Sequence, residues 1–362
     1  MSSSLIKSKN HLMVMAGGTG GHVFPALAVA NALIESGTKI TWLGTRRGLE
    51  ARVIPENNID IQWISVEGLR GKGLLSWLMA PFNLLRAMWQ SAIVIRRLDP
   101  DCVLGMGGFV AGPGGLVARI MGKPLIVHEQ NAVAGLTNKY LAKIASRVLT
   151  GFPNVVGLPS SAHWVGNPVR KNIRAAVSEV ASDADQAIKV LVIGGSQGAH
   201  SFNLHLAAVF AQQSPLIEVW HQSGKDRKAQ VEQSYAKAEL PVRVSEFIDD
   251  MAGAYAWADL LICRAGAMTI AECCAAGKPA LLIPFPFSAG AHQDKNAQVL
   301  VDVGAAKVLD NAELGAPIMV HTLAALLSDK TELQSMGQAA QQLHKPDALA
   351  SVVAACEEYL HA

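Results

Sequence analysis

Short apolar runs alternate along the whole chain with longer segments whose apolar residues recur at helical spacing. The runs cover residues 12–16, 40–43, 61–64, 102–104, 125–128 and 147–149 in the first half, and 190–193, 218–221, 242–244, 260–263, 280–284 and 306–309 in the second. Several of them end in Gly, Ser, Thr or Asn and then enter a helical segment, which is typical of buried parallel strands in doubly wound sheets. The pattern predicts two α/β lobes that bind ligands beyond the carboxyl ends of their strands.

Two breaks divide the chain. The sequence Gly166-Asn167-Pro168 is the expected boundary between the lobes, because proline restricts the residue before it and ends regular structure. The first lobe is then residues 1–167 and the second residues 168–345. A second proline, Pro346, precedes a final helical segment, and residues 346–362 are expected to complete the first lobe. The chain length suits two domains of about 150–200 residues each.

A glycine-rich loop follows the first strand of each lobe, at residues 17–22 (GGTGGH) and 194–199 (GGSQGA). Glycine allows positive φ and a close approach of the backbone to a ligand. Free N–H groups before a helix suit a phosphate or diphosphate. We therefore expect two phosphate-binding lobes that face one another across a cleft.

The first loop does not match the common nucleotide fingerprints. Val23 stands where a dinucleotide-binding loop has its third glycine, and no acidic residue follows the second strand. Arg46 and Arg47 leave an NADP-dependent oxidoreductase as a minor alternative. No G-K-[S/T] follows the loop, which excludes a P-loop.

Composition and charge narrow the class of protein. Half of the residues are hydrophobic, and the five cysteines lack disulfide or metal-ligand spacing, which is typical of reduced thiols. No run of 18 apolar residues exists, so no membrane-spanning helix is expected. The formal charge of +2 combines +8 in residues 1–167 with −6 in the remainder, so only the first lobe should be drawn to an anionic surface.

Residues 74–98 are apolar on part of their surface, and two interpretations stay open. The segment is either a core helix or an exposed patch that enters a membrane interface. The basic charge of the first lobe favours the patch, because anionic headgroups attract basic segments by about 1 kcal/mol per Lys or Arg. The residues expected to form it are Leu75, Met79, Phe82, Lys72 and Arg86.

Polar residues cluster where predicted strands end. Residues 128–131 read His-Glu-Gln-Asn, four polar side chains in a row. His22, just after the first loop, is either a helix-capping residue or a general base, because imidazole accepts a proton near neutral pH. The pair Asp183 and Asp185 lies in a polar connector rather than after a strand, so no metal is expected.

Taken together, eight segments resemble the MurG family of bacterial peptidoglycan N-acetylglucosaminyltransferases. In chain order they are residues 17–22, 68–73, 105–115, 128–131, 166–170, 194–198, 246–251 and 264–272. The resemblance implies a GT-B-type glycosyltransferase fold of two Rossmann-like doubly wound domains. It assigns the acceptor and the membrane to the N-terminal domain and the UDP-sugar donor to the C-terminal domain.

The resemblance also implies an activity. This is the inverting, metal-independent and cofactor-free transfer of N-acetylglucosamine from UDP-N-acetylglucosamine (UDP-GlcNAc) to the C4 hydroxyl of the N-acetylmuramic acid (MurNAc) of lipid I, which gives lipid II for peptidoglycan synthesis. The protein would be peripheral, on the cytoplasmic face of the bacterial inner membrane. Its partners would be both substrates and anionic inner-leaflet lipids. Other cell-wall synthesis proteins are further candidate partners, and no nucleic acid is expected.

Site residues carry over by motif. His22 is the first candidate for the general base and Glu129 the second. The expected UDP-GlcNAc contacts are Thr19, Gly20, Gly21, Asn131, Arg170, Ser196, Ile248, Ala267, Met268, Thr269, Ile270, Ala271, Glu272 and Gln293. A slip of one residue in the segment 284–296 would make His292 the contact in place of Gln293. A UDP-GlcNAc 2-epimerase and a membrane scaffold with a regulatory nucleotide site remain the competing hypotheses.

Overall fold

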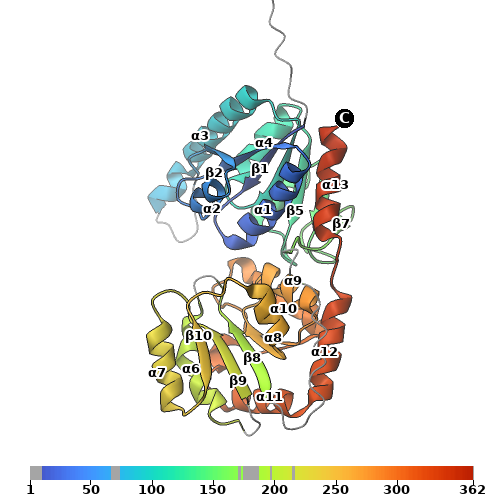
Figure 1. Ribbon diagram of the computed structural model, residues 1–362. Helices are drawn as coiled ribbons and strands as arrows, with labels where there is room; N and C mark the ends of the chain where they lie inside the picture. Colours follow the sequence, from blue (N-terminus) through green and yellow to red (C-terminus); the bar gives the residue numbers. More distant parts are fainter. Residues whose placement is uncertain are drawn as a thin grey trace, which may run out of the picture. The chain divides into compact units, whose positions relative to one another are not determined.

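The computed structural model describes residues 10–66, 74–169, 173, 187–195, 198–213 and 217–361, without the side chains of residues 74–77 and 289. The chain forms two compact units (Figure 1). Unit 1 combines Met1–Pro168 with Asp347–Ala362, and unit 2 is Val169–Pro346. Each unit is described by itself below.

Unit 1 is built on a seven-stranded sheet in the order β3-β2-β1-β4-β5-β6-β7, and its neighbouring strands run parallel. The strands are β1 (His11–Ala16), β2 (Lys39–Gly44), β3 (Asp60–Trp63), β4 (Cys102–Gly107), β5 (Leu125–Glu129), β6 (Arg147–Thr150) and β7 (His163–Trp164). The helices are α1 (Gly20–Glu35), α2 (Glu50–Glu56), α3 (Leu74–Leu98), α4 (Ala111–Ile120), α5 (Leu136–Leu141) and α13 (Ala348–Leu360).

Two apolar cores enclose this sheet. Leu12 and Val14 of β1 pack into a core shared with α1 and α13, whereas Met13 and Met15 pack into a core shared with α3 and α4. The alternation explains why β1 reads as an unbroken apolar run, since a central parallel strand is buried on both faces. The C-terminal helix α13 adds Cys356 to the first of these cores.

Unit 2 repeats the architecture with a six-stranded sheet in the order β10-β9-β8-β11-β12-β13. The strands are β8 (Ile188–Ile193), β9 (Ile217–Gln222), β10 (Val242–Ser245), β11 (Leu260–Cys263), β12 (Ala280–Leu282) and β13 (Ala306–Val308). The helices are α6 (His200–Phe210), α7 (Lys228–Lys237), α8 (Met251–Trp257), α9 (Ala267–Ala276), α10 (His292–Asp302), α11 (Pro317–Ser328) and α12 (Lys330–Gln342), with short 3₁₀ turns η1 (Ala289–Ala291) and η2 (Asn311–Glu313). The prediction of two doubly wound parallel sheets is confirmed.

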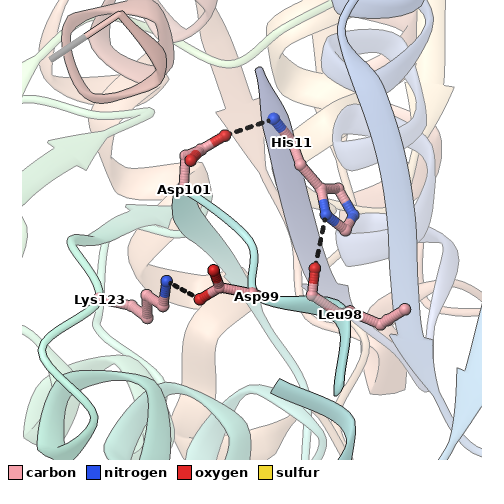
Figure 2. Close-up of polar contacts among 5 residues, drawn as sticks. All are labelled: His11, Leu98, Asp99, Asp101 and Lys123. Carbon is pink, nitrogen blue, oxygen red and sulfur yellow. Dashed lines mark hydrogen bonds and ion pairs between the residues drawn. The ribbon is translucent and has the colours of Figure 1, made fainter. Parts of the chain in front are cut away.

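A polar cluster fastens the amino end of β1 (Figure 2). The backbone N–H of His11 donates to Asp101 Oδ2 at 2.8 Å, and the ring Nδ1 of His11 lies 3.3 Å from the carbonyl oxygen of Leu98. Asp99, in the same turn, pairs with Lys123 at 2.5 Å. The cluster joins β1 to the α3–β4 connection at the amino ends of the strands. The candidate site lies at the other end of the sheet, at the carboxyl ends of the strands.

Buried histidines make the fold sensitive to acid. Burial lowers the pKa of His128 in unit 1 and of His221 in unit 2 to about 4. The unfolded chain takes up these protons near pH 6.5, whereas the folded protein resists until about pH 4, so stability falls as pH drops through that window. Between the two pKa values, each histidine lowers the free energy of unfolding by about 1.4 kcal/mol for every pH unit of acidification.

We therefore expect the urea midpoint to be lower at pH 5 than at pH 7. The variant His221→Gln should lose less stability than the wild type between these two pH values, whatever its stability at pH 7. An equal loss in both proteins would show that His221 does not contribute to the acid sensitivity.

Candidate active site

The first glycine loop is held by a buried carboxylate. Beyond β1 the chain turns through Gly17 and Gly18, where φ of Gly18 is +90°. Glu50 of α2, which is fully buried, accepts the backbone N–H of Gly18 at 2.9 Å. Its other oxygen accepts the backbone N–H and the hydroxyl of Thr45, at 3.0 and 2.8 Å. Glu50 therefore fixes this loop against the turn that follows β2.

The helix that follows, α1, begins without a side-chain cap. Thr19 is the N-cap of α1 in an extended conformation and makes no capping hydrogen bond with its side chain. Thr19 is exposed, and Gly20, Gly21 and His22 are half-buried. These four predicted site residues therefore lie together at the N-terminus of α1, which carries a partial positive charge.

The glycine loop after β4 lies directly against the loop after β1. Gly107 and Gly108 have φ of +100° and +81°. A Cβ atom at Gly108 would lie 2.3 Å from the carbonyl oxygen of Gly17, and one at Gly107 would lie 2.8 Å from the ring of His22. Only glycine fits at either position, so the two loops form one surface.

The polar run at the end of β5, residues 128–131, reaches the same surface through Gln130. The Nδ1 atom of His22 lies 2.8 Å from Gln130 Oε1. The Nε2 atom of Gln130 lies 3.0 Å from Nδ1 of His128, whose own Nε2 lies 3.0 Å from the carbonyl oxygen of Gly166. Gln130 and His128 are both buried.

Glu129 is committed to the loop that follows it. Its Oε1 accepts the backbone N–H of Asn131 at 2.9 Å and the Asn131 side-chain amide at 3.1 Å. Its Oε2 accepts the backbone N–H of Gly135 at 3.0 Å and the Asn138 amide at 2.9 Å. All four lone-pair directions of the buried carboxylate are therefore used, which favours His22 over Glu129 as the base.

The second glycine loop, after β8, contains Gly195 and Gly198 at φ of +85° and +68°. A Cβ atom at Gly198 would lie 2.3 Å from the carbonyl oxygen of Ser223, so this loop also needs a residue without a side chain. The predicted contacts Ser196 and Arg170 lie outside the described residues, as do Lys72 of the expected patch and the Asp183–Asp185 pair.

The start of α9 gathers most of the predicted donor contacts. Its N-cap Gly266 is extended and offers no side chain to the first turn. Along the first turns Met268, Thr269 and Ala271 are half-buried, whereas Ala267 and Ile270 are buried. Glu272 is also buried and accepts a hydrogen bond from the hydroxyl of Tyr255 at 3.0 Å, which fixes the direction of the carboxylate.

The remaining predicted residues of unit 2 have mixed positions. Ile248 is buried, with only 3% of its surface exposed. Gln293 accepts the backbone N–H of Phe285 at 2.8 Å and so shapes the segment 284–296, with His292 beside it half-buried. Among the described residues, no group of three or more His, Cys, Asp and Glu side chains could hold a metal ion.

Helix α3 exposes large apolar side chains. Phe82 is 67% and Met79 46% exposed, and Leu78, Leu85 and Trp89 are exposed as well. Arg86 is exposed on the same helix, whereas the side chain of Leu75 lies outside the described residues. By length and composition alone Leu78–Leu98 would suffice to cross a membrane, contrary to the expectation that no helix would.

Comparison with known proteins assigns the chain to a family. Residues 12–150 match the glycosyltransferase family 28 N-terminal domain, and residues 189–352 match the glycosyltransferase family 28 C-terminal domain. Over 351 residues the chain is 48% identical to the UDP-N-acetylglucosamine–N-acetylmuramyl-(pentapeptide) pyrophosphoryl-undecaprenol N-acetylglucosamine transferase of Shewanella sp. strain W3-18-1. The match covers 95% of this chain and 96% of that protein. The chain belongs to the MurG family.

Other MurG family members agree. The enzyme of the same name from Shewanella loihica is 48% identical over 96% of this chain and 97% of its own. The crystal structure of Acinetobacter baumannii MurG superposes with a TM-score of 0.86 at 38% identity, covering 96% of this chain and 99% of that one. The family predicted from eight short segments is thus confirmed by similarity across nearly the whole chain.

More distant structures share only the fold. The calicheamicin glycosyltransferase CalG4 has a TM-score of 0.70 at 15% identity, with 98% of this chain and 99% of that chain covered. A UDP-GlcNAc 2-epimerase from Neisseria meningitidis has a TM-score of 0.65 at 12% identity, with 96% and 100% covered. The fold therefore does not separate a transferase from an epimerase, and the family assignment does.

In this MurG family member, nothing in the sequence predicted that Glu50 and Arg264 hold loops in place. Glu50 lies in a short helix far from any glycine loop along the chain. Arg264 donates inward to the carbonyl oxygens of Ile283 and Pro284, at 3.0 and 3.1 Å, although a basic residue after a strand suggests a ligand contact. Both depend on contacts between distant segments.

Gly107 offers a test of this packing. Gly107→Ala and Gly122→Ala both force a side chain into positive φ, at about 1–2 kcal/mol each. Only the first adds contact with the His22 ring, because nothing lies within 4 Å of a Cβ atom at Gly122. Gly107→Ala should therefore lower the urea midpoint more than Gly122→Ala and move the His22 ring signals in a ¹⁵N NMR spectrum. Equal midpoints and unchanged His22 signals in both variants would contradict the contact.

Proposed function

We propose that this protein transfers N-acetylglucosamine from UDP-GlcNAc to the MurNAc of undecaprenyl-diphosphate-linked MurNAc-pentapeptide (lipid I), which gives lipid II. The observation that carries the proposal is 48% identity over 95% of the chain to relatives whose name states this transfer. The half-buried imidazole of His22 at the N-terminus of α1 supplies a base suited to it.

The donor is assigned mainly to unit 2. The uncapped N-terminus of α9 places backbone N–H groups where they can meet an anion, and Glu272, directed by Tyr255, can accept both hydroxyls of a ribose. The residues predicted from sequence complete the assignment: Thr19, Gly20, Gly21, Asn131, Arg170, Ser196, Ile248, Ala267, Met268, Thr269, Ile270, Ala271, Glu272 and Gln293. Gln293 is already a backbone acceptor, so its amide N–H groups are the part assigned to the sugar.

The reaction follows as one in-line displacement that inverts the anomeric carbon. Nε2 of His22 removes the proton from the acceptor C4 hydroxyl while that oxygen attacks C1 of N-acetylglucosamine. The bond from C1 to the β-phosphate oxygen breaks, and UDP leaves with the electron pair. Backbone N–H groups and helix N-termini stabilise the growing negative charge, and no metal or cofactor is part of the proposal.

The decisive experiment is transfer from UDP-GlcNAc to a lipid I analogue. His22→Ala should lower kcat by about 10²–10⁴-fold, because a positioned base contributes that much. The affinity for UDP should stay near that of the wild type, because the donor is assigned mainly to unit 2 and His22 is not among its assigned contacts. A kcat near the wild-type value with both substrates saturating would remove His22 from the mechanism.

The same assay separates the competing hypotheses. Incubation with UDP-GlcNAc alone should leave the sugar unchanged. The manno isomer would indicate an epimerase, and donor binding without transfer to the lipid I analogue would indicate a scaffold. Either result would overturn the proposed function.

We place the protein on the cytoplasmic face of the bacterial inner membrane, held by α3 of unit 1. The exposed apolar side chains of Met79 and Phe82 suit the interface, and Arg86 beside them suits anionic headgroups. Residues 1–167 carry a net charge of +8, which adds long-range attraction. Leu75 and Lys72 are assigned to the same patch from sequence, and contacts with other cell-wall synthesis proteins are left open.

Replacing Met79 and Phe82 by serine should weaken binding to vesicles of anionic phospholipid at least tenfold, since each buried apolar side chain contributes about 1.5–3 kcal/mol. The matched control is Phe287→Ser in unit 2, where the ring is 78% exposed. Transfer to a water-soluble acceptor should be unchanged in both variants. Wild-type vesicle binding by the Met79/Phe82 variant would refute the docking role of α3.

A further inference from the structure

His22 ends a chain of hydrogen bonds that starts at a backbone carbonyl. The order is Gly166 O, His128, Gln130 and His22, with separations of 3.0, 3.0 and 2.8 Å. All four residues belong to unit 1. The amide of Gln130 has two possible orientations and each imidazole two tautomers, so the direction of the hydrogen bonds is set by the groups that can only accept or only donate.

The first fixed group is the carbonyl oxygen of Gly166. A carbonyl oxygen only accepts, so Nε2 of His128 must carry a proton and donate to it. Burial lowers the pKa of His128 to about 4, so near neutral pH its other nitrogen, Nδ1, is unprotonated. Nδ1 of His128 is therefore an acceptor.

The second fixed group is the backbone carbonyl oxygen of His128. It lies 3.0 Å from the same end of the Gln130 amide that faces His128 Nδ1. These two acceptors of His128 therefore face that end, and the thioether sulfur of Met106, a weak acceptor, lies 3.9 Å from it. This end must be the NH₂ group, whose two N–H bonds point to the two His128 acceptors. The reversed amide would place its oxygen against a carbonyl oxygen and a lone pair, with no compensating hydrogen bond. Gln130 Oε1 must therefore face His22.

We infer that Gln130 is a positioning residue that sets the tautomer of His22. Oε1 of Gln130 only accepts, so Nδ1 of neutral His22 carries the proton and Nε2 carries the lone pair. None of the described residues makes a hydrogen bond with Nε2 of His22. A free imidazole prefers the opposite tautomer, with the proton on Nε2, which cannot accept a proton there. The inference rests on the proposed role of His22 as base.

The arrangement also serves the reaction step itself. When Nε2 takes the proton of the acceptor hydroxyl, His22 becomes a cation and its Nδ1–H bond to Gln130 becomes charge-assisted and stronger. Gln130 thus orients the base before the step and stabilises its charged form afterwards, as the carboxylate does in a Ser-His-Asp triad. A neutral amide oxygen does this without adding a charge to a buried site.

The first test reads the tautomer in the ligand-free protein. In a ¹⁵N-histidine NMR spectrum at neutral pH, with the His22 signals assigned by their loss in His22→Ala, we expect the protonated-nitrogen shift at Nδ1 and the lone-pair shift at Nε2. Gln130→Met, which keeps the length and removes both polar ends, should move His22 toward the opposite tautomer. The matched control Gln222→Met, at a buried glutamine of unit 2, should leave the His22 signals unchanged. A proton on Nε2 in the wild type would overturn the inference.

The second test reads the consequence for turnover. Gln130→Met should lower kcat at least tenfold with KM nearly unchanged, and it should cost nothing further when added to His22→Ala, because Gln130 acts through His22. An equal loss in both backgrounds would overturn the positioning role. If His22→Ala keeps full activity, the proposed base is wrong, and the NMR experiment still decides whether Gln130 sets the tautomer.

Discussion

The candidate site of unit 1 depends on one close approach, between the backbones of the loops that follow β1 and β4. A side chain at Gly108 would meet the carbonyl oxygen of Gly17, and one at Gly107 would meet the His22 ring. Because the loops touch, α1 begins where Gln130, at the end of β5, can reach His22. The carboxyl ends of three neighbouring parallel strands, β1, β4 and β5, thus meet at one surface. A change in the backbone of any one loop would therefore displace the others.

Buried carboxylates hold these loops in shape. A buried charge is costly unless it is fully hydrogen-bonded, and Glu50 and Glu129 meet that condition with three and four donors respectively. A carboxylate held by several donors is a weaker acceptor for the proton of a substrate. The acidic side chains therefore fix the geometry, and the proposed proton acceptor is the imidazole of His22, whose Nε2 has no hydrogen-bond partner among the described residues.

The sequence was sufficient for the architecture and for bringing the glycine loops and polar strand ends of unit 1 to one surface, because apolar runs, glycine loops and polar strand ends are local signals. It could not indicate which partner each side chain of residues 128–131 binds. All four side chains lie at the carboxyl end of β5, yet His128 binds Gly166 O, Glu129 binds its own loop and Gln130 turns toward His22. The partners of His128 and Gln130 come from other segments, so only the folded chain distinguishes the buried acid from the amide that faces His22.

Unit 2 contains the same device put to structural use. The Asn203 amide donates to the carbonyl oxygen of Ser223 at 2.9 Å, so its oxygen accepts from Nε2–H of His221 at 3.0 Å. Here the second ring nitrogen accepts from the hydroxyl of Tyr235, and burial raises the pKa of that hydroxyl. Both nitrogens of His221 are thus occupied in the core. An amide pinned by a backbone carbonyl fixes the tautomer in either unit, and what distinguishes His22 is that its remaining nitrogen has no partner among the described residues.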